Sequence, residues 1–254
     1  MTQGRLTPAQ LEQLRRLSTC VVASAIETFH VRLPNAGFAN SSIQCVFPDF
    51  RPVVGYAATA RIRTAVPPME GRSYYFRTEW WNEILQIPAP RIVVVEDLDS
   101  PPGLGAFVGE VHANILRALG SVALVTNGSV RDVNEVKAVN FQLFAGNVSV
   151  SHAYAHVFDF GGTVKVGSLE IRPGDLIHGD RHGVVLIPPE IAAQVPDAAA
   201  EILKRRQYFI GLCRSGDFSL ESLRGAMEEQ GEKNGNETEH SKEGRARDAR
   251  RKLQ

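Results

Sequence analysis

The stretch that decides the fold is GEVHANILRALGSVALVTNGSVRDVNEV, which runs from Gly109 to Val136. After Glu110, apolar residues recur at helical spacing until Gly120, a residue typical of helix ends. Val122–Val125 is then a short continuous apolar run, which suits a strand that is covered on both faces. The apolar spacing of a helix returns towards the end of the segment. The sequence therefore predicts a helix, a buried strand and a second helix in succession.

Similar elements flank this segment. The apolar run Ile92–Val95 precedes it, and a further strand is expected around Phe141–Phe144. Strands that alternate with helices form a parallel or mixed sheet, because each helix crosses over between neighbouring strands. The intervening loop GLGAFVG, Gly103 to Gly109, does not fit a dinucleotide-binding fingerprint, because three residues rather than two precede its last glycine.

The rest of the chain supplies helices at both ends and a series of strands. Thr7 to Gln10 forms a capping box with a proline at the first helical position, and a second helical stripe runs from Val21 to Phe29. The other expected elements are an alternating strand at Val53–Val66, an aromatic helix at Tyr74–Leu85, short strands at Val164–Val166, Leu169–Ile171, Leu176–Ile177 and Val184–Ile187, a turn at His178–Asp180, and a helix at Glu190–Phe209.

Composition narrows the class of protein. Lys plus Arg equals Asp plus Glu at 28 each, so no overall charge favours nucleic acid or an anionic membrane as partner. The chain shows neither a signal peptide nor a membrane span, and we expect a cytoplasmic protein. Its three cysteines are widely spaced and suggest neither a disulfide framework nor a zinc site. We expect one domain over residues 1–227 and a disordered charged tail over residues 228–254.

The candidate chemistry follows the central strand. Asn127-Gly128 predicts a positive-φ turn at the carboxyl edge of the sheet, where ligands of open α/β sheets bind. Arg131, Asp132 and Glu135 then fall at the expected start of a helix. Asp132 and Glu135 are three residues apart and should share a helix face, where two carboxylates suit Mg²⁺ or Mn²⁺. Arg131 is placed to bind a substrate carboxylate with two hydrogen bonds.

A purely structural explanation fits the same residues. Asp132 and Glu135 also have the spacing of a capping box, in which Asp132 caps the helix, Glu135 reaches back, and Arg131 pairs with one of them. The sequence leaves both explanations open, and they do not exclude each other.

The second half of the expected site is Gly109-Glu110-Val111-His112. A helix that begins here directs the free backbone N–H groups of Val111 and His112 at whatever lies beyond its N-terminus. Such a helix end is an anion-binding site. Glu110 adds a third carboxylate, although an acid in the first turn is also favoured by the helix dipole alone.

These motifs together resemble the RraA-like family, which includes class II pyruvate aldolases that act on 4-hydroxy-4-methyl-2-oxoglutarate. The resemblance rests on Glu110, Arg131-Asp132 and Glu135 with their spacing, on GYAATARIRT at residues 55–64, and on VGSLEIRPGDLIHGDRHGVVLIP at residues 166–188. It implies an α/β protein with the swivelling β/β/α fold, which has a mixed central sheet, flanking helices and a layer of short strands. It also implies a homotrimer or hexamer with active sites at subunit boundaries.

The resemblance assigns roles to the site residues. Asp132 would bind Mg²⁺ (or Mn²⁺), Arg131 would hold the pyruvate carboxylate, and Glu110 would contact a water on the metal. The backbone N–H groups of Val111 and His112, after Gly109, would support the substrate. The implied activity is metal-dependent cleavage of 4-hydroxy-2-oxo acids to pyruvate, with oxaloacetate decarboxylation through the same enolate.

Other members of the family imply an alternative, a protein-binding regulator that inhibits a ribonuclease without catalysis. The acid at Glu110 favours the enzyme, because the regulator branch lacks it. One departure is that Ala23-Ser24-Ala25-Ile26 stands where the family often has Ser-Asp-Ala-Leu, which leaves Glu27 as a substitute acid. His152 and His156 have the helical spacing of zinc ligands, but no further zinc motif accompanies them.

Overall fold

A computed structural model describes residues 5–69 and 78–229 of the 254-residue chain. Contacts group the chain into two compact units, Met1–Ala199 and Ala200–Gln254. The elements that position the candidate site all belong to the first unit. The predicted domain boundary after residue 227 remains a prediction, and the tail from residue 230 onward lies outside the described residues.

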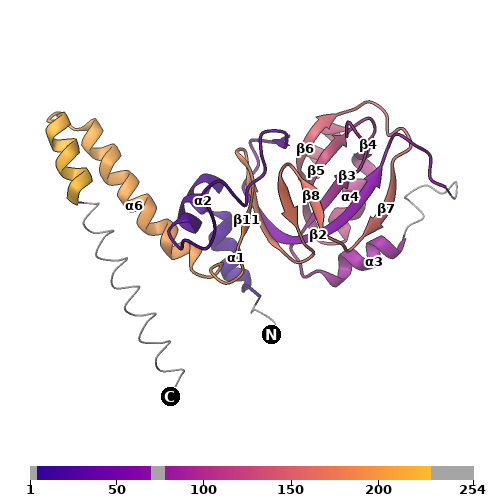
Figure 1. The fold of residues 1–254 in the computed structure, drawn as a ribbon, viewed down its shortest axis with the longest axis horizontal. Helices are drawn as coiled ribbons and strands as arrows, with labels where there is room; N and C mark the ends of the chain where they lie inside the picture. Colours follow the sequence, from indigo (N-terminus) through magenta and orange to yellow (C-terminus); the bar gives the residue numbers. More distant parts are fainter. Residues whose placement is uncertain (1–4, 70–77, 230–254) are drawn as a thin grey trace, which may run out of the picture. The chain divides into compact units, whose positions relative to one another are not determined.

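The first unit is built on a mixed sheet (Figure 1). Its strands follow the order β1-β6-β5-β3-β2-β10-β11, with β4 beside β5 and β7 beside β2. The pairs β2–β3, β3–β5, β4–β5 and β5–β6 are parallel, whereas β1, β7, β10 and β11 pair antiparallel. The strands are β1 (Gln44–Cys45), β2 (Val53–Arg63), β3 (Arg91–Asp97), β4 (Ala106–Val108), β5 (Ser121–Val130), β6 (Gln142–Val148), β7 (His156–Phe160), β10 (Leu176–Asp180) and β11 (Gly183–Ile187).

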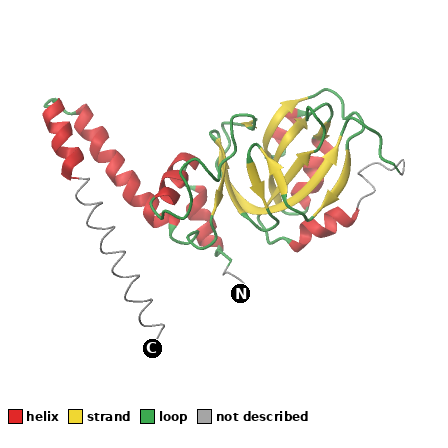
Figure 2. Ribbon diagram, in the orientation of Figure 1, coloured by secondary structure: helices red, strands yellow, loops and turns green. Residues whose placement is uncertain are grey.

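Helices and a two-stranded sheet complete the architecture (Figure 2). The small antiparallel sheet pairs β8 (Val164–Val166) with β9 (Leu169–Ile171). The helices are α1 (Pro8–Arg15), α2 (Thr19–Glu27), α3 (Thr78–Gln86), α4 (Glu110–Ala118), α5 (Val133–Ala138) and α6 (Val195–Arg214), and residues 220–229 are also helical. Among the helices of the described ranges, none has the length and hydrophobicity that a membrane crossing requires.

The two faces of the central sheet bury different layers, because successive side chains of a strand point in opposite directions. Val93 and Val95 pack in a cluster with side chains of α3, α4 and α5, whereas Ile92 and Val94 pack in a second cluster with β8 and β9. The sheet is thus covered by helices on one face and by a short-strand β layer on the other. This arrangement confirms the predicted β/β/α fold class.

Several local predictions are confirmed. Thr7 and Gln10 form both hydrogen bonds of the capping box that starts α1. Gly120 follows the C-terminus of α4 with a φ of 78°, a left-handed conformation that glycine adopts without steric cost. The aromatic helix is present from Thr78 as α3, and its predicted first part, residues 74–77, lies outside the described residues.

Two predicted turns are wrong, because both segments continue as strands. β5 runs through Asn127-Gly128 to Val130, and Gly128 is not among the residues with positive φ. His178 to Asp180 belongs to β10 and pairs with β2 and β11. Asn127 and His178 do not end their strands, because contacts distant in sequence satisfy their polar side chains. Asn127 binds β3, and His178 binds α1 and α2.

Candidate active site

The candidate site forms where β4 and β5 end side by side. The two strands are parallel, with Ala106 opposite Ser129 and Val108 opposite Val130. The backbone N–H of Arg131 continues this pairing by donating to the carbonyl oxygen of Val108 at 2.9 Å. Neighbouring strands lie about 4.8 Å apart. The corner from β4 into α4 therefore lies next to the corner from β5 into α5.

The carboxylate of Asp132 joins these two corners. Its Oδ2 accepts a hydrogen bond from the backbone N–H of Glu110 at 3.0 Å, and its Oδ1 lies 3.2 Å from Nε of Arg131. Asp132 has a φ of 53° and a ψ of 45°, a left-handed conformation that Asp and Asn adopt more readily than other non-glycine residues. The turn predicted at Asn127-Gly128 thus occurs at Asp132.

This geometry rules out the capping box, one of the two explanations that the sequence left open. Asp132 is the N-cap residue of α5, but its side chain does not cap that helix. It binds instead the first N–H of α4, so the predicted capping box with Glu135 is wrong. Asp132 and Glu135 occupy the N-cap and the third position of α5, and their expected common face remains a prediction.

Gly109 permits the close approach of the two corners. A Cβ at this position would lie 2.3 Å from Oδ2 of Asp132 and 3.0 Å from Cγ of Arg131. Carbon and oxygen atoms do not approach to 2.3 Å without a covalent bond, so any side chain here would displace the carboxylate. Glycine at this position is therefore a condition of the contact between Asp132 and Glu110.

The N-terminus of α4 can bind an anion. Its N-cap residue, Gly109, has no side chain with which to cap the N–H groups of Val111 and His112. The N–H groups of a first helical turn point past the helix end, and together with the helix dipole they favour negative charge here. The position of Arg131 next to this helix end adds a full positive charge.

The imidazole of His112 faces the core rather than the site. The side chain is buried, its Nδ1 lies 3.3 Å from the carbonyl oxygen of Phe107, and its ring makes edge contacts with Trp80 and Phe107. Burial lowers the pKa of His112 to about 4, so the ring is neutral at physiological pH. Only the backbone of His112 can therefore serve a substrate, as the sequence analysis expected.

The carboxylates of the site fit a hard cation that keeps most of its water. Mg²⁺ binds proteins through one or two carboxylates, and an aspartate carboxylate has about four acceptor positions, two of which the contacts of Asp132 use. Glu110 and Glu135 are exposed in the first turns of α4 and α5. Within residues 5–69 and 78–229, no three His, Cys, Asp or Glu side chains are grouped to hold a metal. Carboxylate oxygens of this kind suit Mg²⁺ or Mn²⁺.

A buried carboxylate at the end of β3 is not among the residues expected from the sequence. Asp97 accepts hydrogen bonds from the N–H groups of Gly103 at 2.8 Å and Asp99 at 3.1 Å, and burial raises the pKa of its carboxyl. Asp99 in turn accepts from the N–H groups of Thr64 and Ala65. Asp97 is the second of two acids, after Glu96, that follow the apolar run Ile92–Val95, and this pair was the available signal.

The expected zinc spacing of His152 and His156 does not apply, because neither residue is helical. His152 lies in a loop and His156 begins β7. Their Nδ1 atoms contact the nearby carbonyl oxygens of Ala153 and Tyr154, at 2.9 and 2.7 Å.

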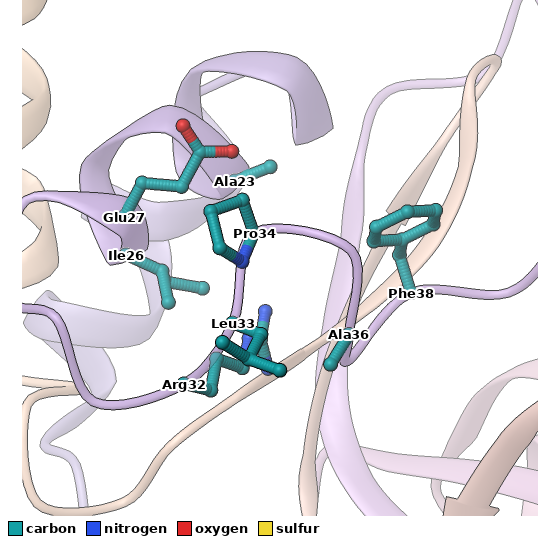
Figure 3. Close-up of a pocket in the computed structure, with 8 residues that line it drawn as sticks. All are labelled: Ala23, Ile26, Glu27, Arg32, Leu33, Pro34, Ala36 and Phe38. Atoms are coloured by element: carbon teal, nitrogen blue, oxygen red, sulfur yellow. The ribbon is translucent and has the colours of Figure 1, made fainter.

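Glu27, the expected substitute acid, lines a shallow pocket (Figure 3). Ala23, Ile26 and Glu27 of α2 form one side, and residues of the following loop form the other: Arg32, Leu33, Pro34, Ala36 and Phe38. Arg32 donates to the carbonyl oxygen of Leu186 at 2.8 Å, and burial lowers its pKa. Neither Arg131 nor Asp132 lines this pocket, so it is separate from the site described above.

Comparisons with known proteins agree with the fold. A family model described as RraA-like (Aldolase/RraA) matches residues 19–186. A protein of Halalkalibacterium halodurans with the provisional name 4-hydroxy-4-methyl-2-oxoglutarate aldolase is 33% identical over 84 residues, which cover 33% of this chain and 40% of that protein. The chain thus matches about two fifths of the length of its curated relatives.

Two solved structures have the same fold over most of the chain. An uncharacterized protein from Pseudomonas syringae pv. tomato str. DC3000 has a TM-score of 0.68 at 21% identity, over 88% of this chain and 96% of that one. Streptomyces coelicolor RraAS2, described as an unusual member of the RNase ES inhibitor RraA protein family, has a TM-score of 0.63 at 18% identity, over 80% and 98%. At these sequence identities the similarity shows that the chain shares the fold of these two proteins.

Proposed function

Because the chain belongs to the RraA-like family, we propose that it is a divalent-metal-dependent class II pyruvate aldolase. The proposed substrates are 4-hydroxy-2-oxo acids such as 4-hydroxy-4-methyl-2-oxoglutarate, which would be cleaved to pyruvate, together with oxaloacetate, which would be decarboxylated. The proposed assembly is a homotrimer or a dimer of trimers.

One observation carries this proposal. The Asp132 carboxylate is bound by the Glu110 N–H and by Arg131 at the N-terminus of α4. An acid, a guanidinium and the N-terminus of a helix therefore meet at a single edge of the sheet. A site for a metal-bound 2-oxo acid requires this combination of one anion ligand and several anion-binding groups.

The reaction develops negative charge beside the carboxylate of the substrate. Removal of the 4-hydroxyl proton lets the bond between carbons 3 and 4 break, and its electrons form a pyruvate enolate that is then protonated. Loss of carbon dioxide from oxaloacetate leaves the same enolate. When bound at Asp132, Mg²⁺ or Mn²⁺ would supply Lewis-acid stabilisation of this charge.

The residues of the chain have distinct parts in the proposal. Arg131 uses Nε for Asp132, and its terminal nitrogens carry further donors for the substrate carboxylate. The N–H groups of Val111 and His112 orient the substrate at the end of α4. We assign the transfer of the hydroxyl proton to Glu110, acting through a water. Glu135 is proposed as a second group near the cation.

The test is release of pyruvate from 4-hydroxy-4-methyl-2-oxoglutarate and from oxaloacetate, with Mg²⁺ and with a chelator. The decisive variant is Asp132→Asn, because Asn adopts the left-handed conformation and keeps an oxygen for the Glu110 N–H while it removes the charge. We expect the chelator to abolish turnover and Asp132→Asn to lower it by about 100-fold or more.

Turnover that survives both the chelator and Asp132→Asn would contradict the proposal. Absence of turnover on both substrates would favour the other class found in this family, a protein-binding regulator of the ribonuclease-inhibitor type.

A further inference from the structure

The strand that carries the site residues changes its neighbour halfway along its length. From Ser121 to Thr126, β5 pairs with β3, and from Ser129 onward it pairs with β4. Its register with β6 also shifts between Thr126 and Ser129. At this irregularity β5 leaves β3, and β4 occupies the place beside it.

The side chain of Asn127 bridges the point of separation. Its Oδ1 accepts from the backbone N–H of Asp97 at 2.7 Å, and its Nδ2 donates to the carbonyl oxygen of the same residue at 3.0 Å. A primary amide thus makes the two hydrogen bonds that a backbone rung would make between parallel strands. Both ends of the amide are used, and a residue without both a donor and an acceptor cannot replace it.

The same region fixes the loop that leads into β4. Gly103 donates its N–H to Asp97 at 2.8 Å, and its carbonyl oxygen accepts from the hydroxyl of Ser129 at 2.6 Å. A Cβ at Gly128 would lie 3.2 Å from Cβ of Asp97, so β3 and β5 remain in close contact here. Asp97 and Ser129 are both buried, which shields these hydrogen bonds from water.

We propose that Asn127 is a positioning residue for the reaction proposed above, on which this inference rests. Its amide holds the end of β3 while the β5 backbone turns to β4. The position of β5 then sets the separation between the corner from β4 into α4 and the corner from β5 into α5. The Asp132 carboxylate and the Glu110 N–H are in direct contact at this separation, with no atom between them. The corners are so close that position 109 has space only for glycine.

The test is Asn127→Asp, which replaces the side-chain amide NH₂ group by an oxygen atom. The ionised carboxylate keeps the acceptor for the Asp97 N–H but sets an oxygen against the Asp97 carbonyl oxygen. Protonation restores an O–H donor at that position. Charged side chains of the neighbouring elements include Asp97 at the end of β3, Asp99 just after it, and Arg63 of β2, which pairs with Asp99 at 3.4 Å. Glu96 of β3 accepts from the backbone N–H of Lys165 in β8 at 2.9 Å. Asp97 borders this point, so its negative charge opposes ionisation of the introduced acid.

Asn147→Asp is the matched control. Asn147 lies opposite Ser129 on β6, is exposed, and binds only the adjacent Val148 N–H through Oδ1 among the described contacts of its side chain. We expect Asn127→Asp to release pyruvate about 10-fold more slowly than wild type at pH 8 and to approach the wild-type rate at pH 5.5. The rate of pyruvate release by Asn147→Asp should stay within about twofold of the wild-type rate at both pH values.

Hydrogen exchange at residues 107–116 is a readout that does not depend on turnover. We expect faster exchange there in Asn127→Asp than in Asn147→Asp at pH 8, with exchange in α1 and α2 unchanged. If the wild type releases no pyruvate, the proposed function fails, and hydrogen exchange still decides the positioning role. Equal rates and equal exchange in the two variants would overturn the inference. Asn127→Ser, which removes the amide without adding charge, replaces the first variant if that variant does not fold.

Discussion

At the scale of single residues, the account depends on how closely the backbone at Gly109 approaches Asp132. We predict that Gly109→Ala lowers pyruvate release by about 10-fold or more, because the added methyl group would lie 2.3 Å from Oδ2 of Asp132 and must displace it. Gly109 has an extended conformation that alanine also adopts, so the free energy of unfolding should change by only about 1 kcal/mol. Steady-state kinetics and urea unfolding measure the two effects.

Gly162→Ala is the control for this prediction, because a Cβ at Gly162 meets no atom within 4 Å. It should leave both turnover and stability close to those of wild type. If Gly109→Ala and Gly162→Ala had equal turnover, the proposed role of the close approach would be wrong.

The site residues could be predicted from the sequence to different degrees. Gly109, Glu110, Arg131 and Asp132 were expected together, because strand ends of a parallel sheet meet at one edge, and the structure brings them together. The direction of the Asp132 side chain was not predictable, because it depends on a left-handed backbone that Asp adopts without a local sequence signal. The strand position of Asn127 does not follow from local sequence, because its partner Asp97 is 30 positions away.

At the scale of elements, a buried histidine fastens the first two helices to the sheet. Nε2 of His178 lies 3.1 Å from the carbonyl oxygen of Leu14 in α1, and its Nδ1 lies 3.0 Å from the hydroxyl of Thr19 in α2. A carbonyl oxygen can only accept, so Nε2 carries the proton and Nδ1 accepts from the hydroxyl of Thr19. Asp180 also accepts from the Thr19 N–H at 2.9 Å.

We predict that Thr19→Val lowers the free energy of unfolding by about 1–3 kcal/mol, because it leaves Nδ1 of His178 buried without its donor. Urea denaturation followed by circular dichroism measures the change. Thr28→Val is the control at the other end of α2, since the Ala25 carbonyl oxygen that binds its hydroxyl also accepts the Thr28 N–H. The interpretation of His178 would be wrong if both variants lost the same stability.

Most strands could be located from the sequence, but the residues at which they end could not. β8 and β9 were located by apolar residues on either side of an exposed charged residue. Apolar runs located β3, β5, β10 and β11, because buried strands of a covered sheet are continuously apolar. They stopped short at Asn127 and His178, whose polar side chains are satisfied by partners distant in sequence. β7 was missed because its pairing with β2 joins residues about 100 positions apart, which local patterns do not reveal.

At the scale of the whole molecule, two buried histidines make stability depend on pH. Burial lowers the pKa of His112 to about 4 and also lowers the pKa of His178. The unfolded chain therefore binds protons below about pH 6.5, while the folded chain does not. The free energy of unfolding should fall as the pH decreases from about 6.5 towards 4, by about 3 kcal/mol for His112 alone.

Urea unfolding at pH 7 and pH 5 tests this prediction. His112→Phe keeps an aromatic ring and removes the titrating group, so the loss of stability between these two values should shrink by about 2 kcal/mol. An unchanged difference between pH 7 and pH 5 would show that His112 does not govern the acid response.

In the site that we propose, Asp132 binds a divalent cation beside Arg131 at the ends of β4 and β5. Titration of the full chain with Mn²⁺, followed by electron paramagnetic resonance of the free ion, tests it most directly. We predict that the wild type binds Mn²⁺, that pyruvate tightens this binding, and that Asp132→Asn weakens it by about 10-fold or more. Equal binding of Mn²⁺ by the wild type and Asp132→Asn would contradict the account.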